Sequence, residues 1–497
     1  MQNTEHHDAH GGQDKAHSAS TDRQTGDRQS LDLTAAPPRV LGTPTAVLLI
    51  AASMIGAGVF TTTGFLIRDL GSASAVLLAW AIGGITALCG ALAYAELAAA
   101  LPQNGGEYRL LGRIYHPAVG FVAGWISLVV GFSAPMAAAA IAFGEYTERL
   151  FPGLFPDLFP DLFPDLFPGL SPTLVGLTAI LCLALLHGFR VRLGGLVQGA
   201  VTTLTILLIL AFIAGGLAFG DLHRLTPLGD PQTLQAIRSP AFAVGLVFVS
   251  FAYSGWNAAA YIAGEVAKPS RSIPRALIIG TVTVTLLYLG LNLVFVTSAP
   301  ASALSGVVEI GYVAAQALFH DPRITAGLTV VVALGLLTTV SALMMAGPRV
   351  YEALGADYPR LRGLAARLTR GTDSNPTKTT GARGPARAIA LQALLAAAMM
   401  LSTTFSDLLT YMGITLALSS GLTVAGVFVL RWREPELPRP YRTWGHPLTT
   451  LLALSLMAWM IIFTVGERPI TSLFAAATIA AGLGLYAAVR PRPQSYP

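Results

Sequence analysis

Two glycine-containing stretches interrupt long apolar runs of this chain. The first stretch consists of Met54, Ile55, Gly56, Ala57 and Gly58, and the second of Phe251, Ala252, Tyr253, Ser254, Gly255 and Trp256. Glycine tolerates the backbone dihedrals of an unwound turn, so each stretch predicts a break in a helix. Inside a lipid bilayer such a break is tolerated only where it lines a cavity or is buried in protein, because each unsatisfied amide costs several kcal/mol. The two breaks are therefore the candidates for a binding site.

The two breaks favour complementary chemistry. A half-helix that begins near Gly56 presents free amide donors and its positive dipole end, which suits a carboxylate. The alternative for this stretch is a packing seam of small residues between membrane helices. A half-helix that ends near Tyr253 leaves carbonyl oxygens that can accept hydrogen bonds from an ammonium group. Together the breaks predict a receptor for a zwitterion, in the pattern typical of secondary transporters built from inverted repeats. Trp256 is interpreted either as a gate over this site or as a packing aromatic.

The composition predicts a membrane protein. Of the 497 residues, 53% are hydrophobic and 11% are charged, whereas soluble globular proteins carry about 25% charged residues. Apolar runs of roughly 17 to 25 residues indicate transmembrane helices. The chain has twelve such runs, at 43–67, 72–100, 117–146, 172–188, 194–219, 240–266, 274–298, 325–352, 388–405, 406–432, 446–465 and 470–489. The fold class is therefore an all-α polytopic membrane protein with twelve transmembrane helices. Because the first run follows a long polar stretch, we expect no cleavable signal peptide.

The placement of charge predicts the orientation in the bilayer. Most of the 31 Lys and Arg residues fall in the N-terminal tail or in loops on one side, for example Arg109, Arg113, Lys268 and Arg431. The positive-inside rule places both termini in the cytoplasm, and we expect an integral protein of the cytoplasmic (plasma) membrane. The basic surplus is thus a topology signal, and it indicates no nucleic-acid partner.

Three segments outside the apolar runs are expected to add no packed structure. Residues 1–40 are rich in His, Gln, Asp, Ser and Thr, which is typical of a disordered tail, here cytoplasmic. Its histidines could bind a transition metal weakly, but a solvated tail is the simpler interpretation. Residues 151–170 repeat Phe-Pro-Gly/Asp-Leu, and proline at every fourth position forbids a continuous helix. We expect an external loop there, with a cation ladder of its Asp residues as the alternative. Residues 491–497 form a second cytoplasmic tail.

Short motifs resemble those of a known family. The strings 55–60 (Ile-Gly-Ala-Gly-Val-Phe) and 251–257 (Phe-Ala-Tyr-Ser-Gly-Trp-Asn) resemble the amino acid–polyamine–organocation superfamily. Within it they are most similar to the branch of the L-amino acid transporters and their bacterial homologues. Supporting strings lie at 93–97, 105–108, 264–266, 349–351 and 439–442. The resemblance covers roughly residues 40–490.

The resemblance implies a single transporter domain over residues 41–490. Repeat one lies at about 43–219, an inverted repeat two at about 240–432, and two extra helices at 446–489. Helices 1 and 6 of this five-plus-five arrangement are the broken ones. By resemblance, amides around Gly56 hold a substrate carboxylate, and the carbonyl oxygens of Met54, Ile55, Phe251, Ala252 and Ser254 face its amino group. The implied activity is alternating-access transport of amino acids without a cofactor, either as exchange or coupled to an ion.

The chain departs from the family at a position that bears on coupling. Many bacterial members carry a lysine in helix 5 that replaces a coupling sodium ion, and Thr205 stands at that position here. The segment 194–219 contains no ionisable residue, so proton coupling through that lysine is not available. Thr205 could instead bind Na⁺ together with the hydroxyls of Thr338, Thr339 and Ser341. Packing is the alternative role for these residues, and uncoupled exchange is an equally open interpretation.

Carboxylates inside predicted spans are candidate functional groups. Glu96 and Glu265 lie near cytoplasmic ends, where we expect pairing with Arg109, Lys268 or Arg271. No deep carboxylate is evident near either break, which disfavours a strongly cationic substrate. We therefore predict neutral L-amino acids of small to medium size.

Other functions fit the sequence less well. An enzyme would need a nucleophile with its base or a metal cluster, and His187 has no ligand neighbour at suitable spacing, so we predict no catalytic residue and no certain metal site. A channel or receptor does not require paired breaks. The serious alternative is a transporter of the same fold for a nucleobase or a polyamine. Cys89 and Cys182 both lie in predicted spans, so we expect no disulfide-linked ancillary subunit.

Overall fold

The described part of the chain is helical. The computed structural model describes residues 41–152, 171–189, 194–361 and 386–490. The predicted tails 1–40 and 491–497, and all but two residues of the 151–170 repeat, lie outside these ranges. Within them no β-strand occurs, and the β-type pairing consists of isolated bridges of Leu41 with Val266 and of Asn104 with Ile262. A chain that crosses lipid must satisfy its backbone polar groups internally, which explains the choice of helix.

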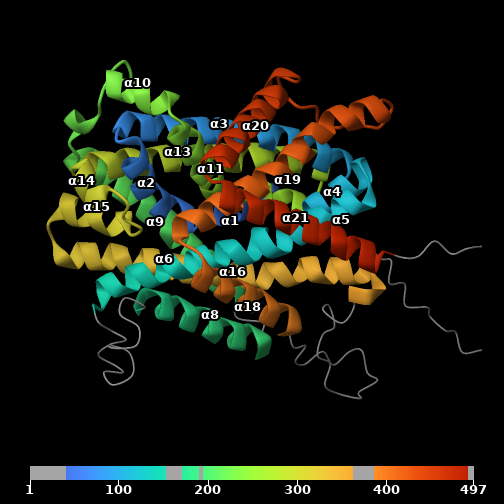
Figure 1. Ribbon diagram of the computed structural model, residues 1–497, viewed down its shortest axis with the longest axis horizontal. Coiled ribbons are helices and arrows are strands. Elements are labelled where there is room, and N and C mark those ends of the chain that lie inside the picture. The colour runs from blue at the N-terminus through green and yellow to red at the C-terminus, as the bar shows by residue number, and fades with distance from the viewer. Residues whose placement is uncertain (1–40, 153–170, 190–193, 362–385, 491–497) are drawn as a thin grey trace, which may run out of the picture. The chain divides into compact units, whose positions relative to one another are not determined.

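The helices follow one another in the order that Figure 1 shows. Those of the first half are α1 (Thr43–Met54), α2 (Ala57–Leu70), α3 (Ala73–Ala100), α4 (Gly106–Ile114), α5 (Pro117–Ile126), the π-helical η1 (Ser127–Ser133), α6 (Ala134–Leu150), α8 (Ser171–Phe189) and α9 (Gly194–Phe219). Those of the second half are η2 (Leu222–Arg224), α10 (Pro231–Arg238), α11 (Pro240–Ala252), α12 (Ala258–Tyr261), α13 (Pro269–Ser298), α14 (Ala301–Leu304), α15 (Ile310–Phe319), α16 (Pro322–Asp357), η3 (Pro359–Leu361), α18 (Ala386–Ser402) and α19 (Phe405–Arg433). The last two are α20 (Leu448–Glu467) and α21 (Pro469–Val489).

The apolar helices support a polytopic membrane protein. By length and composition, eight described helices could each cross a membrane, or ten if each of two bent helix pairs counts as one span. One bent pair is α1 with α2, bent by 41°, and the other is α10 with α11, bent by 70°. The fourth and ninth predicted runs form α8 and α18, whose described apolar parts are shorter than the other spans. The count of twelve spans and the inverted five-plus-five topology stay predictions.

Local sequence explains where helices start and change register. Gly71 ends α2 with φ of +62°, and its amide donates to Ile67 O at 2.9 Å. Ser72 then caps α3 by accepting a hydrogen bond from the amide of Ala75. The third predicted run is continuous but passes through the π-helical η1 just before Pro135. Proline lacks an amide hydrogen, so the usual hydrogen bond of that turn cannot form and the register shifts.

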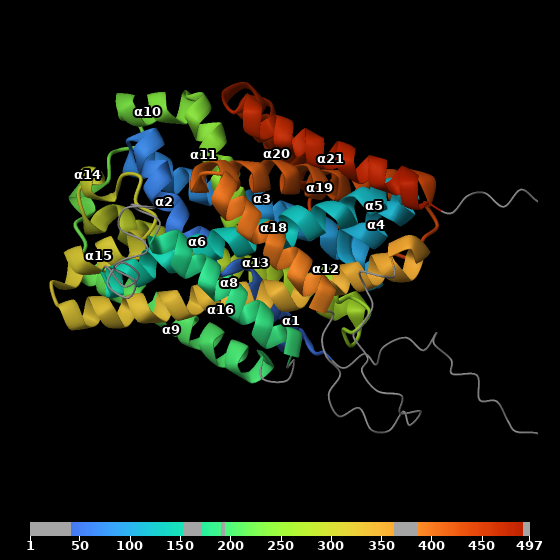
Figure 2. The ribbon, with the colours of Figure 1, turned by 60° about the horizontal axis from the view of Figure 1, so that its bottom comes forward.

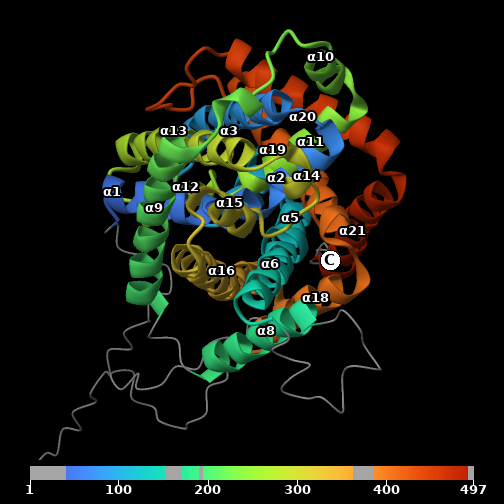
Figure 3. The same ribbon diagram turned by 90° about the vertical axis from the view of Figure 1, so that its left-hand side faces the viewer.

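The packing separates inner from peripheral helices. Figures 1 and 3 place α6 alongside α16, with α8 against α6. Helix α13 packs against both α1 and α3, and α11 packs against α2 and α3. In Figure 2, α20 and α21 run along one edge of the bundle beside α19. Their outer faces expose large apolar side chains such as Ile462, Ile470 and Phe474, which suits helices that face lipid.

Two ends of the bundle matter for the site. Helix α4 lies at one end, which we call the α4 end, and α14 and α15 lie at the other, which we call the α15 end. At the α4 end, Arg109 pairs with Asp357 at 2.9 Å and Arg113 with Glu434 at 2.6 Å. At the α15 end, Arg149 pairs with Glu309 at 2.6 Å.

Candidate substrate site

The first predicted break is present. The sequence centres it on Gly56 to Gly58, whereas the non-helical residues are Ile55 and Gly56. Helix α1 ends at Met54, Ile55 and Gly56 are not helical, and α2 begins at Ala57. Ala57 and Gly58 are buried in the first turn of α2. The first amides of a helix have no partner within it, so this turn offers donors of the kind that bind a carboxylate.

The second break lies where the sequence predicts it, but it is asymmetric. Helix α11 ends at Ala252, residues 253–257 form turns, and only the single turn α12 follows before residue 262. Gly255 adopts a φ of +100°, a conformation that residues with a side chain rarely adopt. The apolar run 240–266 therefore does not form two half-helices of similar length.

The two breaks are in direct contact. A Cβ atom on Gly58 would lie 2.4 Å from the Cα of Ala252, and one on Gly255 would lie 2.5 Å from the carbonyl oxygen of Ser53. Both glycines thus face backbone of the opposite break, and a methyl group would not fit at either position. The small residues act as a packing seam here, which is the alternative that the sequence leaves open for Gly58.

A tyrosine that the sequence did not single out joins the two breaks. The Tyr288 hydroxyl of α13 donates to the carbonyl oxygen of Met54 at 2.5 Å and to that of Ala252 at 3.3 Å. The carbonyl oxygen of Phe251 accepts from the amide of Ser254 at 2.8 Å. Three of the five carbonyl groups predicted to face the substrate amino group therefore already have donors in this conformation.

The aromatic residues of the second break pack on α3. The Tyr253 hydroxyl donates to the carbonyl oxygen of Trp80 at 3.1 Å. Trp256 is 6% exposed, lies over Gly90 and meets the ring of Tyr94 edge-on, with ring centroids 4.7 Å apart. In this conformation Trp256 has the packing role rather than the gate role.

The predicted ion-site residues come together in part. The Thr338 and Thr339 hydroxyls both donate to the carbonyl oxygen of Gly335, at 2.8 and 2.9 Å. Thr205 lies beside Gly335, and Thr339 lies beside Gly56 of the first break. Ser341 is separate, because its hydroxyl lies 2.8 Å from Nε2 of His187 on α8. Thr205 of α9 thus lies against α16, and Thr339, one turn further along α16, lies against the first break.

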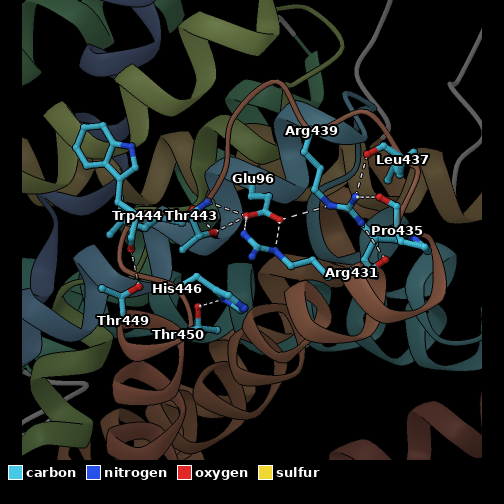
Figure 4. Close-up of polar contacts among 12 residues, drawn as sticks. Glu96, Arg431, Pro435, Leu437, Arg439, Thr443, Trp444, His446, Thr449 and Thr450 are labelled. Atoms are coloured by element: carbon cyan, nitrogen blue, oxygen red, sulfur yellow. Dashed lines mark hydrogen bonds and ion pairs between the residues drawn. The ribbon is translucent and has the colours of Figure 1, made fainter.

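The partners predicted for Glu96 are wrong. Figure 4 shows its carboxylate paired with Arg431 at 2.7 Å and with Arg439 at 3.6 Å. The amide of Thr443 also donates to it at 2.7 Å. The reason is that the 434–447 connection folds back over the end of α3, whereas Arg109 pairs with Asp357 instead. Glu265 accepts a hydrogen bond from Asn104 at 3.2 Å.

A buried carboxylate does lie near a break, contrary to the expectation from sequence. Glu107 on α4 is 3% exposed, and it accepts a hydrogen bond from Asn257 at 3.1 Å. In the sequence Glu107 lies in a short string after a predicted span, so its burial could not be predicted.

The neighbouring Tyr108 is a hydrogen-bond donor. Burial and the Asp357 carboxylate raise the pKa of Tyr108, which keeps its hydroxyl a donor to Asp357.

Comparison with known proteins decides the family. Residues 41–485 match the model of the family described as amino acid permease. The chain belongs to the amino acid permease family. This confirms the resemblance seen in the sequence, and the family consists of membrane transporters rather than enzymes.

The relatives of this permease are named for amino acid transport. It is 26% identical over 453 residues to the large neutral amino acids transporter small subunit 2 of Mus musculus, covering 90% of this chain and 80% of that protein. It is 26% identical over 451 residues to the serine/threonine exchanger SteT of Bacillus subtilis, covering 91% and 94%. It is 26% identical over 459 residues to the b(0,+)-type amino acid transporter 1 of Mus musculus, covering 90% and 87%.

Proposed function

We propose that this permease moves neutral L-amino acids of small to medium size across the cytoplasmic membrane by alternating access. The observation that carries the proposal is the contact between the two breaks, which brings the free amides of α2 next to the carbonyl ends of α1 and α11. A carbonyl oxygen has two lone pairs, so those of Met54 and Ala252 can accept from an ammonium group in addition to Tyr288. Donors for an anion and acceptors for a cation then lie side by side, as a zwitterion requires.

Charge at the site favours a neutral side chain. Glu107 is the buried carboxylate near the second break, and its oxygens accept from Tyr94, Asn257, Ser419 and Ser420. A cationic side chain would have to displace these donors to reach it. Two of the relatives are named as a large neutral amino acids transporter and a serine/threonine exchanger, which supports a neutral side chain but not its size.

The orientation follows from charge. Arg109, Arg113, Arg431 and Arg439 all lie at the α4 end, so we assign this end, with both chain termini, to the cytoplasm. Of the two cysteines, Cys89 lies within α3 and Cys182 within α8. We therefore propose that no ancillary chain is attached through a disulfide.

Coupling is proposed to use exchange or Na⁺ rather than a proton carried by helix α9. Hydroxyl and carbonyl oxygens are suitable ligands for a hard cation. Thr205 lies beside Gly335, whose carbonyl oxygen accepts from Thr338 and Thr339, and Thr339 lies beside Gly56. Threonine cannot titrate between inward-facing and outward-facing states.

The deciding experiment is a thermal-shift screen of the purified protein with the twenty amino acids, with and without Na⁺. Proteoliposome uptake of each radiolabelled hit then follows. We expect stabilisation and saturable uptake for ligands such as alanine, serine, threonine or leucine. A response to arginine or lysine alone, or only to a nucleobase or a polyamine, contradicts the proposal and supports the alternative substrate of the same fold.

A further inference from the structure

The Glu107 carboxylate is a junction between separate elements. It lies in the first turn of α4 and is 3% exposed. Tyr94 of α3 donates to it at 2.5 Å, and Asn257 of the 253–257 turn donates at 3.1 Å. Ser420 of α19 donates at 3.2 Å, and the neighbouring Ser419 donates to the other carboxylate oxygen. One side chain thus ties α4 to three other parts of the protein.

The donors to this carboxylate carry no charge. The two arginines of α4 pair with other carboxylates, Arg109 with Asp357 and Arg113 with Glu434. None of the ion pairs found among the described residues includes Glu107. A buried charge without a counter-ion is costly and is held only by well-placed hydrogen bonds. Because these donors belong to three different elements, the carboxylate is compensated only while the elements stay in this arrangement.

The junction is adjacent to the substrate break. Asn257 directly follows Trp256, and the ring of Trp256 rests on the ring of Tyr94. Both residues therefore connect the carboxylate to the turn that ends α11. The other side of this turn holds Gly255 against Ser53 of α1.

Further contacts close the same end of the bundle. The amide of Gly105 donates to the carbonyl oxygen of Tyr261 at 3.1 Å, and the amide of Gly264 donates to the Asn104 side chain at 2.9 Å. Residues 104–107 therefore lie across the segment 257–264, at the α4 end of the break. Glu107 is the residue whose side chain extends this closure to α3 and α19.

We propose that Glu107 is a positioning residue that fastens the α4 end of the substrate site in the closed state, and that its four hydrogen bonds must break when this end opens. Bonds that join one carboxylate to three elements cannot survive the separation of α4 from α3, from the 253–257 turn and from α19. The inference rests on alternating access, proposed above, and not on the identity of the substrate.

The test measures opening directly by cysteine labelling. Ala260 is 2% exposed and lies in α12, within the segment 257–264 that residues 104–107 lie across. In a Cys89→Ser, Cys182→Ser background, Ala260→Cys serves as the reporter for a membrane-impermeant maleimide, without substrate. Glu107→Gln should speed labelling about tenfold, because an amide has one acceptor oxygen where the carboxylate has two. Glu436→Gln, which removes an exposed carboxylate at the same end, should leave the rate unchanged.

Milder variants keep the test decisive if Glu107→Gln does not fold. Ser419→Ala and Tyr94→Phe each remove one donor, and each should speed labelling by a smaller factor while the protein elutes as a single species. Labelling rates equal to that of Glu436→Gln in the folded variants would overturn the proposal. The labelling does not depend on transport, so a failure of amino acid uptake by the unmodified protein would count against the proposed function and not against this role of Glu107.

Discussion

The hydroxyl of Tyr288 lies 2.5 Å from the carbonyl oxygen of Met54, the last residue of α1. Because the same hydroxyl also reaches Ala252, the last residue of α11, a single oxygen terminates both broken helices. The Tyr288 side chain is fully buried, so no solvent could replace it.

Tyr288→Phe should therefore weaken both the fold and the site. The change leaves buried carbonyl groups without their donor, at a cost of about 1–3 kcal/mol. We expect a lower apparent melting temperature in detergent and slower amino acid exchange. Tyr411→Phe is the matched control, because its hydroxyl bonds only to Thr478 at the periphery between α19 and α21. Equal losses in the two variants would show that the position of Tyr288 between the breaks has no special consequence.

Gly56→Leu should abolish transport while the protein still folds. A Cβ at Gly56 would meet Thr339 at 3.5 Å and the carbonyl oxygen of Met54 at 4.0 Å, both ordinary contact distances, and the backbone there has a φ of −146°, which any residue adopts. A leucine side chain would fill the space in which the carboxylate approaches the α2 amides. Uptake and size-exclusion profiles should be measured for Gly56→Leu and Gly56→Ala.

The contrast with Gly58 sharpens this prediction. Gly58→Ala should destabilise the protein itself, because its Cβ would lie 2.4 Å from the Cα of Ala252. Uptake at the unmodified rate by a well-folded Gly56→Leu protein would place the carboxylate elsewhere.

The breaks were predictable from sequence because local residue types determine them. Glycines within apolar runs place the first break within a residue, and the end of α11 at Ala252 agrees with the prediction. The contacts around them were not predictable, since Tyr288, Glu107 and Arg431 reach their partners from helices distant in sequence. Whether Ser341 faces the first break or His187 depends on the rotation of α16, which the sequence does not reveal because Thr338, Thr339 and Ser341 lie on different sides of the helix.

Thr205→Lys tests the coupling. Thr205 lies beside Gly335, where the Thr338 and Thr339 hydroxyls converge, so an ammonium group there would occupy the position of a bound cation. We expect any Na⁺ dependence of uptake to disappear in this variant. In the unmodified protein, an inward pH gradient alone should drive little accumulation in proteoliposomes, less than internal amino acid or an inward Na⁺ gradient. Strong accumulation driven by the pH gradient would contradict the assignment and direct attention to a carboxylate.

Glu96→Ala should be among the most destabilising single changes at the α4 end. Arg439 is 6% exposed, and removal of one partner of a buried ion pair costs about 3–5 kcal/mol. Glu434→Ala breaks the pair with Arg113, whose side chain is 53% exposed, and should cost only about 0.2–1 kcal/mol. The two apparent melting temperatures, measured in the same detergent, check the difference. A loss for Glu96→Ala no larger than for Glu434→Ala would show that the Glu96 network contributes little.

His446 should make stability depend on pH. Burial and the nearby charge of Arg431 lower the pKa of His446 from the ordinary value of 6.5, so the folded protein favours the neutral ring. Stability from this group is complete above about pH 6.5 and is lost as the pH falls through the lowered folded value. The loss of melting temperature between about pH 7.5 and 5.5 should be smaller in His446→Gln than in the unmodified protein. Identical pH profiles would contradict this.

The glycine contacts of α2 have a mechanical consequence. Gly58 near its start leaves no room against Ala252, and Gly64 one to two turns later leaves none against Val307, where the amide of Gly306 also donates to Gly64 O at 2.8 Å. These two points lie about 9 Å apart along the helix. No side chain that could change rotamer lies between the surfaces at these two points. We therefore expect α2 to transmit motion as a rigid body. A tilt of α2 at the first break should displace residues 306–307 at the α15 end.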